Sequence, residues 1–562
     1  MAEAVRAAPE RAVYRGFIQK MHHTGMAYRI FRPRTPKAWL LARALVCALA
    51  AYPLVATPAG TSLGASPTAK NLPDLGDGTE MSPAAERRLG DGIARSLYRD
   101  PDYVDDPVIA GYVQSIWQPL LDAARARGDL RPDMEELYAW DILLARDRSV
   151  NAFALPGGYF GLHLGLVAIV TSRDELASVL GHELSHVTQR HIARNISQQS
   201  AQQPWMIGAM ILGMLAAAKS NSPDAANAMI IGGQAAAIQS QLNFSRDMER
   251  EADRVGFGVS TAAGFAPEGF VGMFEKLQMA NRLNDSGNFP YLRSHPLTTE
   301  RIADMQNRIS LAPTSAPAAP TPPADWEPLM VSARARLLSN PGVDALRAWE
   351  ADAQADALQT RSPAQQAATL YGATLAAVKL REFDRAQTLL SRLQTQVRGR
   401  PVALRLAQLL GAEASMARGD APDAVQRLAS APQPGSGAWL DRAQLILMAQ
   451  AQTRHAVPQG LAQASQNMHA WAQNHPKDAS AWRTLGAVYE VQGRAVAAIR
   501  AQAHADAIEQ DWNAALSRLR AAQDLVRTGQ WGAAGPDFIE AAIVDTRARE
   551  IVQRLREQAL QR

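Results

Sequence analysis

The segment VLGHELSHVTQRH, residues 179–191, carries two histidines and a glutamate at a spacing typical of metal chemistry. His182 and His186 are four residues apart, so an α-helix places both on one face, where they could bind one metal ion together. Zinc favours ligands of this kind, and it acidifies a water and polarises a carbonyl. Glu183 lies one step round the helix, where it could take a proton from that water and pass it to a leaving amine. The pattern predicts a zinc metalloendopeptidase with Glu183 as the general base.

A third metal ligand must come from elsewhere in the chain. The longer motif H-E-x-x-H-x-x-G-x-x-H requires glycine at position 189 and histidine at position 192. The chain has Gln189 and Ile192 there. We therefore expect His191 to be a surface residue or to support a ligand from behind.

The segment SRDMEREADRVGF, residues 245–257, offers a better third ligand. Glu249 and Asp253 are four residues apart on a predicted helix, so one face can present both. Glu249 would complete a His-His-Glu set, and Asp253 would orient a ligand histidine through its ring N–H. Glu251 points elsewhere on this helix, and we expect it to be solvated.

The elements that must position these residues follow from the periodicity of apolar residues. Residues 83–130 have helical spacing, whereas residues 138–150 alternate and predict a strand. Residues 151–169 contain Pro-Gly-Gly between two extended pieces, which predicts a hairpin. From Arg173 onward the pattern is helical, with one apolar stripe formed by Leu176, Val179, Leu180 and Leu184.

A proline-rich segment, residues 312–326, separates this part from a helical, alanine-rich remainder. We expect residues 72–311 to form the metalloprotease domain and residues 327–562 a tetratricopeptide-repeat domain. Five alanines recur at intervals of 36 to 38 residues, and residues 482–498 carry the W-x-x-L-G-x-x-Y pattern of such repeats. A plain helical bundle is the alternative. The alanines are Ala386, Ala424, Ala462, Ala498 and Ala534.

Residues 1–60 are typical of a targeting segment. Basic residues precede an apolar run over residues 44–56, and small residues follow it. The run is shorter than the roughly 20 residues that span a bilayer, so we expect a cleaved signal peptide; an uncleaved anchor is the alternative. Cys47, the one cysteine, lies in this run. A cleaved chain would then have no disulfides, which suits the bacterial periplasm.

The distribution of charge argues against a nucleic-acid partner. Residues 1–56 hold nine Lys and Arg against two Asp and Glu, a net charge of +7. The whole chain is +4, so the remainder is 4 − 7 = −3. The body of the protein therefore has no basic surplus to attract nucleic acid.

Residues 204–218, PWMIGAMILGMLAAA, are apolar on all sides but short for a membrane span. They predict either a peripheral contact with the membrane or a partner, or a buried helix that covers the active site.

Four motifs together resemble the zinc peptidase family of HtpX and the CAAX prenyl proteases. They are NAFALPGG, HELSHVTQRH, E-x-x-A-D at residues 249–253 and SHPLTTER at residues 294–301. The resemblance covers the chain from about Leu72 onward, and the repeat half matches in pattern more than in residues. It implies a mainly α fold, with a gluzincin-type metalloprotease domain that contains a small β-sheet, followed by the helical repeats.

The resemblance also implies how the protein works. A substrate strand would pair with the edge of the sheet near Asn151, Phe153, Gly157 and Gly158, beside one zinc ion per chain. The signal segment and the repeats resemble periplasmic members of the family. Such members degrade misfolded or stalled outer-membrane β-barrel proteins and assist their assembly, with the repeats recruiting the assembly machinery. The alternative is a repeat-based chaperone or scaffold whose protease site is latent.

His295, in the motif SHPLTTER, has three candidate roles. A zinc site with four protein ligands is inert, so a fourth ligand on a movable loop would hold the protease latent. The resemblance implies this inhibitory role. Alternatively, His295 could hydrogen-bond the tetrahedral intermediate, or it could cap or pack against a helix that begins at Pro296.

Overall fold

The computed structural model describes residues 81–199, 245–283, 289–311, 326–354, 356–432 and 438–560. These residues all belong to one unit of the chain, Asp74–Arg562. The predicted targeting segment with Cys47, the apolar segment 204–218 and most of the proline-rich linker lie outside the described ranges. The described part is mainly helical with one small sheet, which confirms the predicted fold class.

The sheet has three strands in the order β1-β3-β2. β1 (Asp141–Ala145) pairs in parallel with β3 (Tyr159–His163), and β2 (Ala152–Leu155) pairs antiparallel with β3. The turn η1 (Pro156–Gly158) joins β2 to β3, which is the predicted hairpin. β2 is therefore an edge strand.

The first strand is shorter than residues 138–150, the range that its alternation predicts. Trp140 has a φ of 54°, in the left-handed region, so the extended chain begins only at Asp141. At the other end, the Asp147 carbonyl accepts a hydrogen bond from Gly165 N instead of continuing the ladder. Alternation of residue types cannot reveal either interruption.

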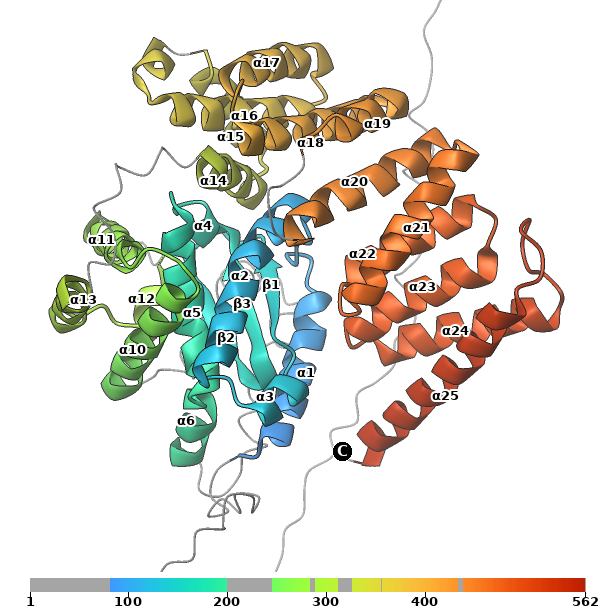
Figure 1. Ribbon diagram of the computed structural model, residues 1–562, viewed down its shortest axis with the longest axis horizontal. Coiled ribbons are helices and arrows are strands. Elements are labelled where there is room, and N and C mark those ends of the chain that lie inside the picture. The colour runs from blue at the N-terminus through green and yellow to red at the C-terminus, as the bar shows by residue number, and fades with distance from the viewer. Residues whose placement is uncertain are drawn as a thin grey trace, which may run out of the picture. The chain divides into compact units, whose positions relative to one another are not determined.

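Helix α5 (Arg173–Thr188) begins at the predicted residue and is the central helix of the protease half. It packs against β2, α2, α10 and α11 (Figure 1). Every residue from Glu175 to Thr188 is buried. The surrounding helices are α1 (Pro83–Tyr98), α2 (Pro107–Arg127), α3 (Pro132–Leu137), α4 (Leu164–Val167), α6 (His191–Gln199), α10 (Arg246–Ala262), α11 (Glu268–Leu283), α12 (Pro290–Ser294) and α13 (Thr299–Leu311).

Two glycines set the distance between α5 and α10. A Cβ atom on Gly256 would lie 3.0 Å from the backbone of Gly181, and one on Gly181 would lie 2.5 Å from Ser260 Oγ. Neither position has room for a larger residue, so the two backbones approach closely. This contact lies one turn or less from His182 and Asp253, residues that the sequence assigns to the metal site.

From Trp326 onward every regular element of the described residues is helical. Successive helices pack on one another, as in the pairs α16 with α17, α18 with α19 and α22 with α23 (Figure 1). The assignment to tetratricopeptide repeats stays a prediction. The elements are α14 (Trp326–Ser339), α15 (Val343–Asp352), η2 (Asp356–Thr360), α16 (Pro363–Lys379), α17 (Phe383–Gln396), α18 (Pro401–Arg418), α19 (Ala421–Ala429), α20 (Ala438–His455), α21 (Pro458–Asn474), α22 (Ala479–Val491), α23 (Ala495–Ile508), α24 (Trp512–Arg527) and α25 (Phe538–Leu560).

Two buried arginines join the helical half to the start of α2. Arg334 on α14 donates to both carboxylate oxygens of Asp106, at 2.8 and 2.6 Å. Arg442 on α20 lies 3.2 Å from Asp105. Burial alone would raise the pKa of Asp106, but the Arg334 guanidinium beside it holds that pKa below its usual value. The two halves are therefore tied by two ion pairs, of which Arg334–Asp106 is buried on both sides.

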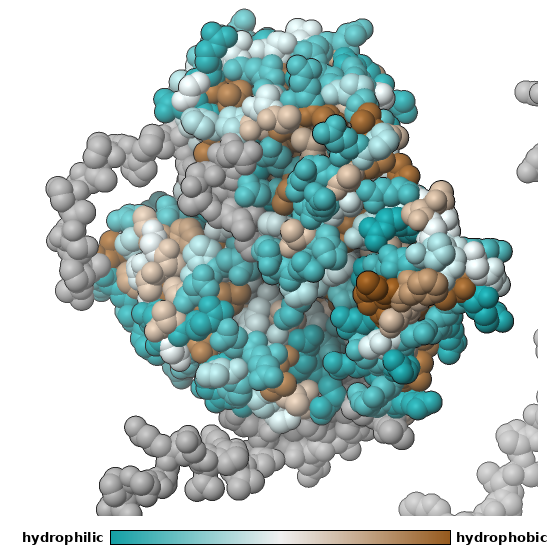
Figure 2. All heavy atoms as spheres, turned by 45° about the vertical axis from the view of Figure 1, so that its right-hand side comes forward, coloured by the Kyte–Doolittle hydropathy of each residue, from teal (hydrophilic) through white to brown (hydrophobic). Residues whose placement is uncertain are grey.

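The face in Figure 2 is mainly hydrophilic, with hydrophobic side chains in small groups. Among the described residues, Phe538 and Ile539 at the start of α25 are the most exposed large apolar side chains, each at 76%. No described helix combines the length and the apolar character that a membrane crossing needs.

Candidate metal centre

Helix α5 presents its polar motif because its other side is firmly packed. The Ser172 side chain caps the helix by accepting from Glu175 N at 3.1 Å. The predicted apolar stripe, Leu176, Val179, Leu180 and Leu184, is buried. His182, Glu183 and His186 therefore come from a rigid helix whose rotation is fixed by this packing.

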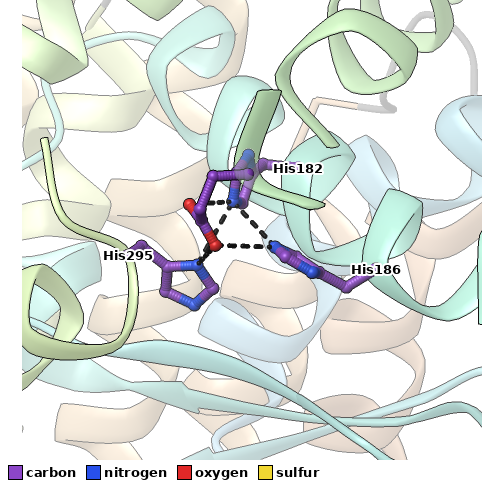
Figure 3. A group of neighbouring side chains, drawn as sticks. His182, His186 and His295 are labelled. Atoms are coloured by element: carbon purple, nitrogen blue, oxygen red, sulfur yellow. Dashed lines mark hydrogen bonds and ion pairs between the residues drawn. The ribbon is translucent and has the colours of Figure 1, made fainter. Parts of the chain in front are cut away.

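The structure brings four side chains into one buried group: His182, His186, Glu249 and His295 (Figure 3). One ligand atom from each lies within 4.8 Å of all the others. His182 Nε2 lies 3.0 Å from His186 Nε2 and 3.3 Å from His295 Nδ1. Glu249 Oε1 lies 3.5 Å from His186 Nε2 and 2.9 Å from His295 Nδ1.

These separations fit zinc. Imidazole nitrogens and carboxylate oxygens bind zinc at about 2.0–2.1 Å, so tetrahedral ligands lie about 3.3 Å from one another. The four separations given above run from 2.9 to 3.5 Å. The donor set of three imidazoles and one carboxylate is also typical of zinc and not of Ca²⁺ or Mg²⁺, which prefer oxygen ligands. The residues present therefore fit the predicted ion.

Glu183 lies between the metal group and the sheet. Its Oε2 accepts a hydrogen bond from Ala154 N at 3.0 Å, and its Oε1 lies 3.5 Å from His295 Nε2. Burial raises the pKa of the Glu183 carboxyl above its usual value. The carboxyl is thus fixed by β2 through one oxygen, with the other directed at the metal group.

The remaining predicted residue, Asp253, lies directly behind His182. Its Oδ1 is 2.9 Å from His182 Nδ1, so the ring presents Nε2 to the metal group. Arg301 donates to both Asp253 oxygens, at 2.7 and 2.8 Å, and its Nη1 lies 2.9 Å from Glu249 Oε2. Burial alone would raise the pKa of Asp253, but Arg301 and His182 hold it below its usual value.

His191 is not a surface residue: it is fully buried behind His186, the second of the two placements that the sequence left open. Its Nδ1 lies 2.9 Å from His186 Nδ1, and its Nε2 lies 3.0 Å from Glu251 Oε2. Glu251 is outside the metal group and partly exposed, as expected, and its carboxylate also pairs with Arg194 at 2.8 Å. Helical spacing on α10 alone gave no sign of these contacts.

Two further residues at the site had no role in the sequence analysis. Arg301 belongs to the quoted motif SHPLTTER, and a charged residue there could have signalled a buried partner. Tyr291 gave no signal at all. Its ring packs on His295 with centroids 4.7 Å apart, and its backbone N donates to the Val150 carbonyl at 3.4 Å. The helix after His295 begins at Thr299, not at Pro296.

Of the four residues expected on the substrate edge, two lie in or next to β2 and two lie in the turn that follows it. Phe153 lies in β2, and Asn151 immediately precedes that strand. Gly157 and Gly158 lie beyond its end, in the turn, with φ values of 73° and 77°. A Cβ atom on Gly157 would lie 2.7 Å from Arg87 Cα, so this turn is held against α1. The edge is therefore shorter than expected and ends at Leu155.

Comparisons with known proteins agree with this geometry. Residues 110–309 match the model of peptidase family M48. A β-barrel assembly-enhancing protease of Escherichia coli is 28% identical over 477 residues, 82% of this chain and 89% of the relative. A Vibrio cholerae protein described as a "putative beta-barrel assembly-enhancing protease" is 34% identical over 327 residues, 57% of this chain and 63% of the relative. The mitochondrial metalloendopeptidase OMA1 of Saccharomyces cerevisiae is 27% identical over 205 residues, 36% of this chain and 56% of the relative.

These matches bear on several predictions. They confirm the resemblance, the enzyme class and the zinc cofactor. The roles of the individual site residues, the domain boundaries, the cleaved signal peptide and the repeats stay predictions.

Proposed function

We propose, from the premise that this chain carries a zinc metalloendopeptidase domain of peptidase family M48, that it cleaves extended segments of misfolded or stalled outer-membrane β-barrel proteins. We propose further that it does so in the periplasm and assists assembly of these barrels. The names of its relatives, β-barrel assembly-enhancing proteases, support the substrate class. The predicted signal peptide supports the location. The observation that carries the proposal is the buried His-Glu-His group beside an edge strand.

The outer edge of β2 is suited to an extended peptide. The Asn151 carbonyl accepts from His163 N on β3, so strand alternation directs the backbone polar groups of Ala152 and Ala154 away from β3. Ala154 N donates to Glu183, so this edge faces the general base. A segment must be extended and have unpaired backbone groups to add a strand at an edge, and the strands of a closed β-barrel do not. Selection for misfolded chains would follow from this requirement.

Asn151 supports the same reading of the edge. Its side chain is fully buried, yet neither of its amide atoms has a hydrogen-bond partner among the described residues. An unpaired buried amide costs stability, so natural proteins seldom retain one without use. An amide can donate to a peptide carbonyl and accept from a peptide N–H, and we assign it to the substrate backbone in the open state, after α12, which is bonded to the adjacent Val150 carbonyl, has moved away.

His182, His186 and Glu249 would hold the zinc ion. When bound, zinc supplies polarisation of the scissile carbonyl and acidification of the attacking water. Glu183 accepts the proton of that water and delivers it to the leaving amine, while the Ala154 N–H fixes the carboxyl in position. Asp253 orients His182, and Arg301 holds both Asp253 and Glu249.

We assign His295 to the inhibitory role. His295 Nδ1 is 2.9 Å from Glu249 Oε1, within the metal group, and a fourth ligand would close the site. The segment that carries His295 also contacts the proposed substrate edge, because Tyr291 N donates to the Val150 carbonyl. Closure by His295 would therefore block both the open coordination position of the zinc ion and access of a substrate strand to the β2 edge. Exposed substrate strands would compete with this segment.

The aromatic residues of the W-x-x-L-G-x-x-Y motif are poor candidates for the partner surface of the helical half. Trp482 and Tyr489 are buried in the core of that half and cannot contact a partner directly. Phe538 and Ile539 on α25 are exposed apolar residues and are better candidates for recruiting the assembly machinery. Peripheral membrane contact through residues 204–218 stays a proposal.

The test compares the wild-type chain with Glu183→Gln on a denatured outer-membrane barrel protein and on the same protein folded. Glutamine keeps the acceptor for Ala154 N–H, so the fold and zinc content should be unchanged. Loss of the general base should lower the cleavage rate about 100-fold or more. Cleavage of the folded barrel at the rate of the denatured one would contradict selection by an edge strand.

The closed arrangement of His295 favours one alternative function, a repeat-based chaperone whose protease site is latent. The same variant separates the two. Full rescue of barrel assembly by Glu183→Gln in a strain that lacks the native protein would favour the chaperone. Failure of rescue would favour the protease.

A further inference from the structure

The two histidines of α5 receive different support from behind. His182 has a carboxylate directly on its Nδ1, at 2.9 Å from Asp253 Oδ1. His186 Nδ1 lies 2.9 Å from the Nδ1 of another histidine, His191. The nitrogen of His186 that faces the metal group is Nε2, at 3.0 Å from His182 Nε2. The contact with His191 is therefore on the side away from the metal.

An unbroken helix could not make this contact. His191 follows His186 by five residues, which corresponds to a rotation of about 140° around a helix. The chain instead breaks between α5 and α6, where Arg190 adopts a φ of 55° in the left-handed region. The Arg190 guanidinium is held by Glu86 and by the Met81 carbonyl. A backbone conformation that is unfavourable for arginine is thus maintained, and it returns His191 to the back of His186.

The hydrogen-bond roles in this group follow from the metal chemistry. A histidine that binds zinc through Nε2 carries its hydrogen on Nδ1. His186 Nδ1 must then donate to His191 Nδ1, which leaves the hydrogen of His191 on Nε2. That Nε2 lies 3.0 Å from Glu251 Oε2, a carboxylate that Arg194 also holds at 2.8 Å. Each of these two N–H groups therefore has an acceptor: His191 accepts from His186, and Glu251 accepts from His191.

We propose that His191, itself held by Glu251, is the positioning residue for the zinc ligand His186. The pair fixes the orientation and tautomer of His186, as Asp253 does for His182. This inference deepens the proposed metal site and rests on it. In metal sites generally, residues that hold a ligand histidine from behind affect affinity for the ion about 10- to 100-fold.

Two substitutions of His191 distinguish hydrogen bonding from packing. His191→Phe preserves the ring volume but has no acceptor, whereas His191→Asn loses volume but keeps an acceptor oxygen near the position of Nδ1. If His191 works as an acceptor, zinc affinity should fall about 10- to 100-fold in His191→Phe and less in His191→Asn. If it only fills space, the order is reversed.

The measurement is zinc affinity of the full chain by competition with a chromophoric chelator. Thermal unfolding in excess chelator checks the fold of each zinc-free variant. The control is Glu300→Gln, a carboxylate change at an exposed ion pair with Arg250 outside the proposed series. It should bind zinc as the wild type does. Zinc affinity in His191→Phe equal to that of the wild type, or above that of His191→Asn, would overturn the proposal.

A second variant keeps the test decisive if His191→Phe does not fold. Glu251 is half-buried, so Glu251→Ala leaves the buried histidine in place and removes only its carboxylate. Zinc affinity should fall here too, and an unchanged affinity would contradict the series. The assay needs no peptidase activity. A chain that binds zinc as expected but cleaves nothing would sink the proposed function and leave this inference standing.

Discussion

Replacement of His295 by alanine separates the inhibitory role from the catalytic one by the sign of the change in rate. His295 Nδ1 makes a charge-assisted contact of 2.9 Å with Glu249, inside a buried group. A hydrogen bond to a charged group contributes about 1.5–3 kcal/mol. If that contact holds the segment closed, its loss raises the open population by roughly 10- to 150-fold, because about 1.4 kcal/mol corresponds to tenfold. In the zinc-loaded chain His295 Nδ1 would bind the ion instead of donating to Glu249, and we take the hydrogen-bond value as the lower bound of that interaction.

The assay is steady-state cleavage of a denatured barrel protein by His295→Ala and wild type at equal zinc occupancy. We expect His295→Ala to retain zinc, since His182, His186 and Glu249 remain, and to cleave faster. The matched control is His455→Ala, which removes an imidazole from the end of α20, outside the site. A rate below wild type would refute the inhibitory role and favour stabilisation of the tetrahedral intermediate. An unchanged rate would refute the inhibitory and the catalytic role and would indicate that His295 only packs against its neighbours.

Two further predictions concern the ligand set and the tie between the halves. Glu249→Ala combined with His295→Ala leaves only His182 and His186 of the metal group, so the double variant should lose zinc and activity together, measured by elemental analysis; full zinc occupancy would contradict the role of Glu249 as a ligand. Arg334→Met leaves the buried carboxylate of Asp106 without its cation, so it should destabilise the chain by about 3–5 kcal/mol in denaturant unfolding. Arg527→Met, at an exposed ion pair, is the control and should cost less than about 1 kcal/mol; an equal loss in both would contradict the argument.

The parts of the site that could be predicted are pairs of residues at a spacing that places them on one face of a helix. His182 with His186, and Glu249 with Asp253, are each four residues apart, and the structure brings all four together. The hairpin was equally local, because Pro156 and two glycines specify a turn. Features that depend on the backbone conformation of a single residue, and not on the periodicity of residue types, could not be predicted. The β1 boundary depends on the left-handed Trp140, and the placement of His191 depends on the left-handed Arg190.

Long-range ion pairs form the other unpredictable class. Arg301 and Asp253 are 48 residues apart in sequence, and no spacing rule connects them. The same holds for Arg334 with Asp106. Trp482 illustrates the opposite problem. Its motif was recognisable, but the motif does not say whether the ring faces the core or a partner, and the ring is buried.

The position of Arg301 constrains how the segment with His295 could open. Arg301 is held by both oxygens of Asp253, lies 2.9 Å from Glu249 and donates to the Pro296 carbonyl at 3.0 Å. These buried ion pairs also keep His182 oriented, so breaking them would disturb the metal ligands themselves. The chain from Pro296 through Arg301 must therefore stay in place when the site is active. We expect opening on the other side of His295, in α12, where Tyr291 N donates to the Val150 carbonyl at 3.4 Å and the Tyr291 side chain interacts with the Glu183 carboxyl. A strand that pairs along β2 would meet that bond first, which gives an exposed substrate strand a direct means of releasing His295.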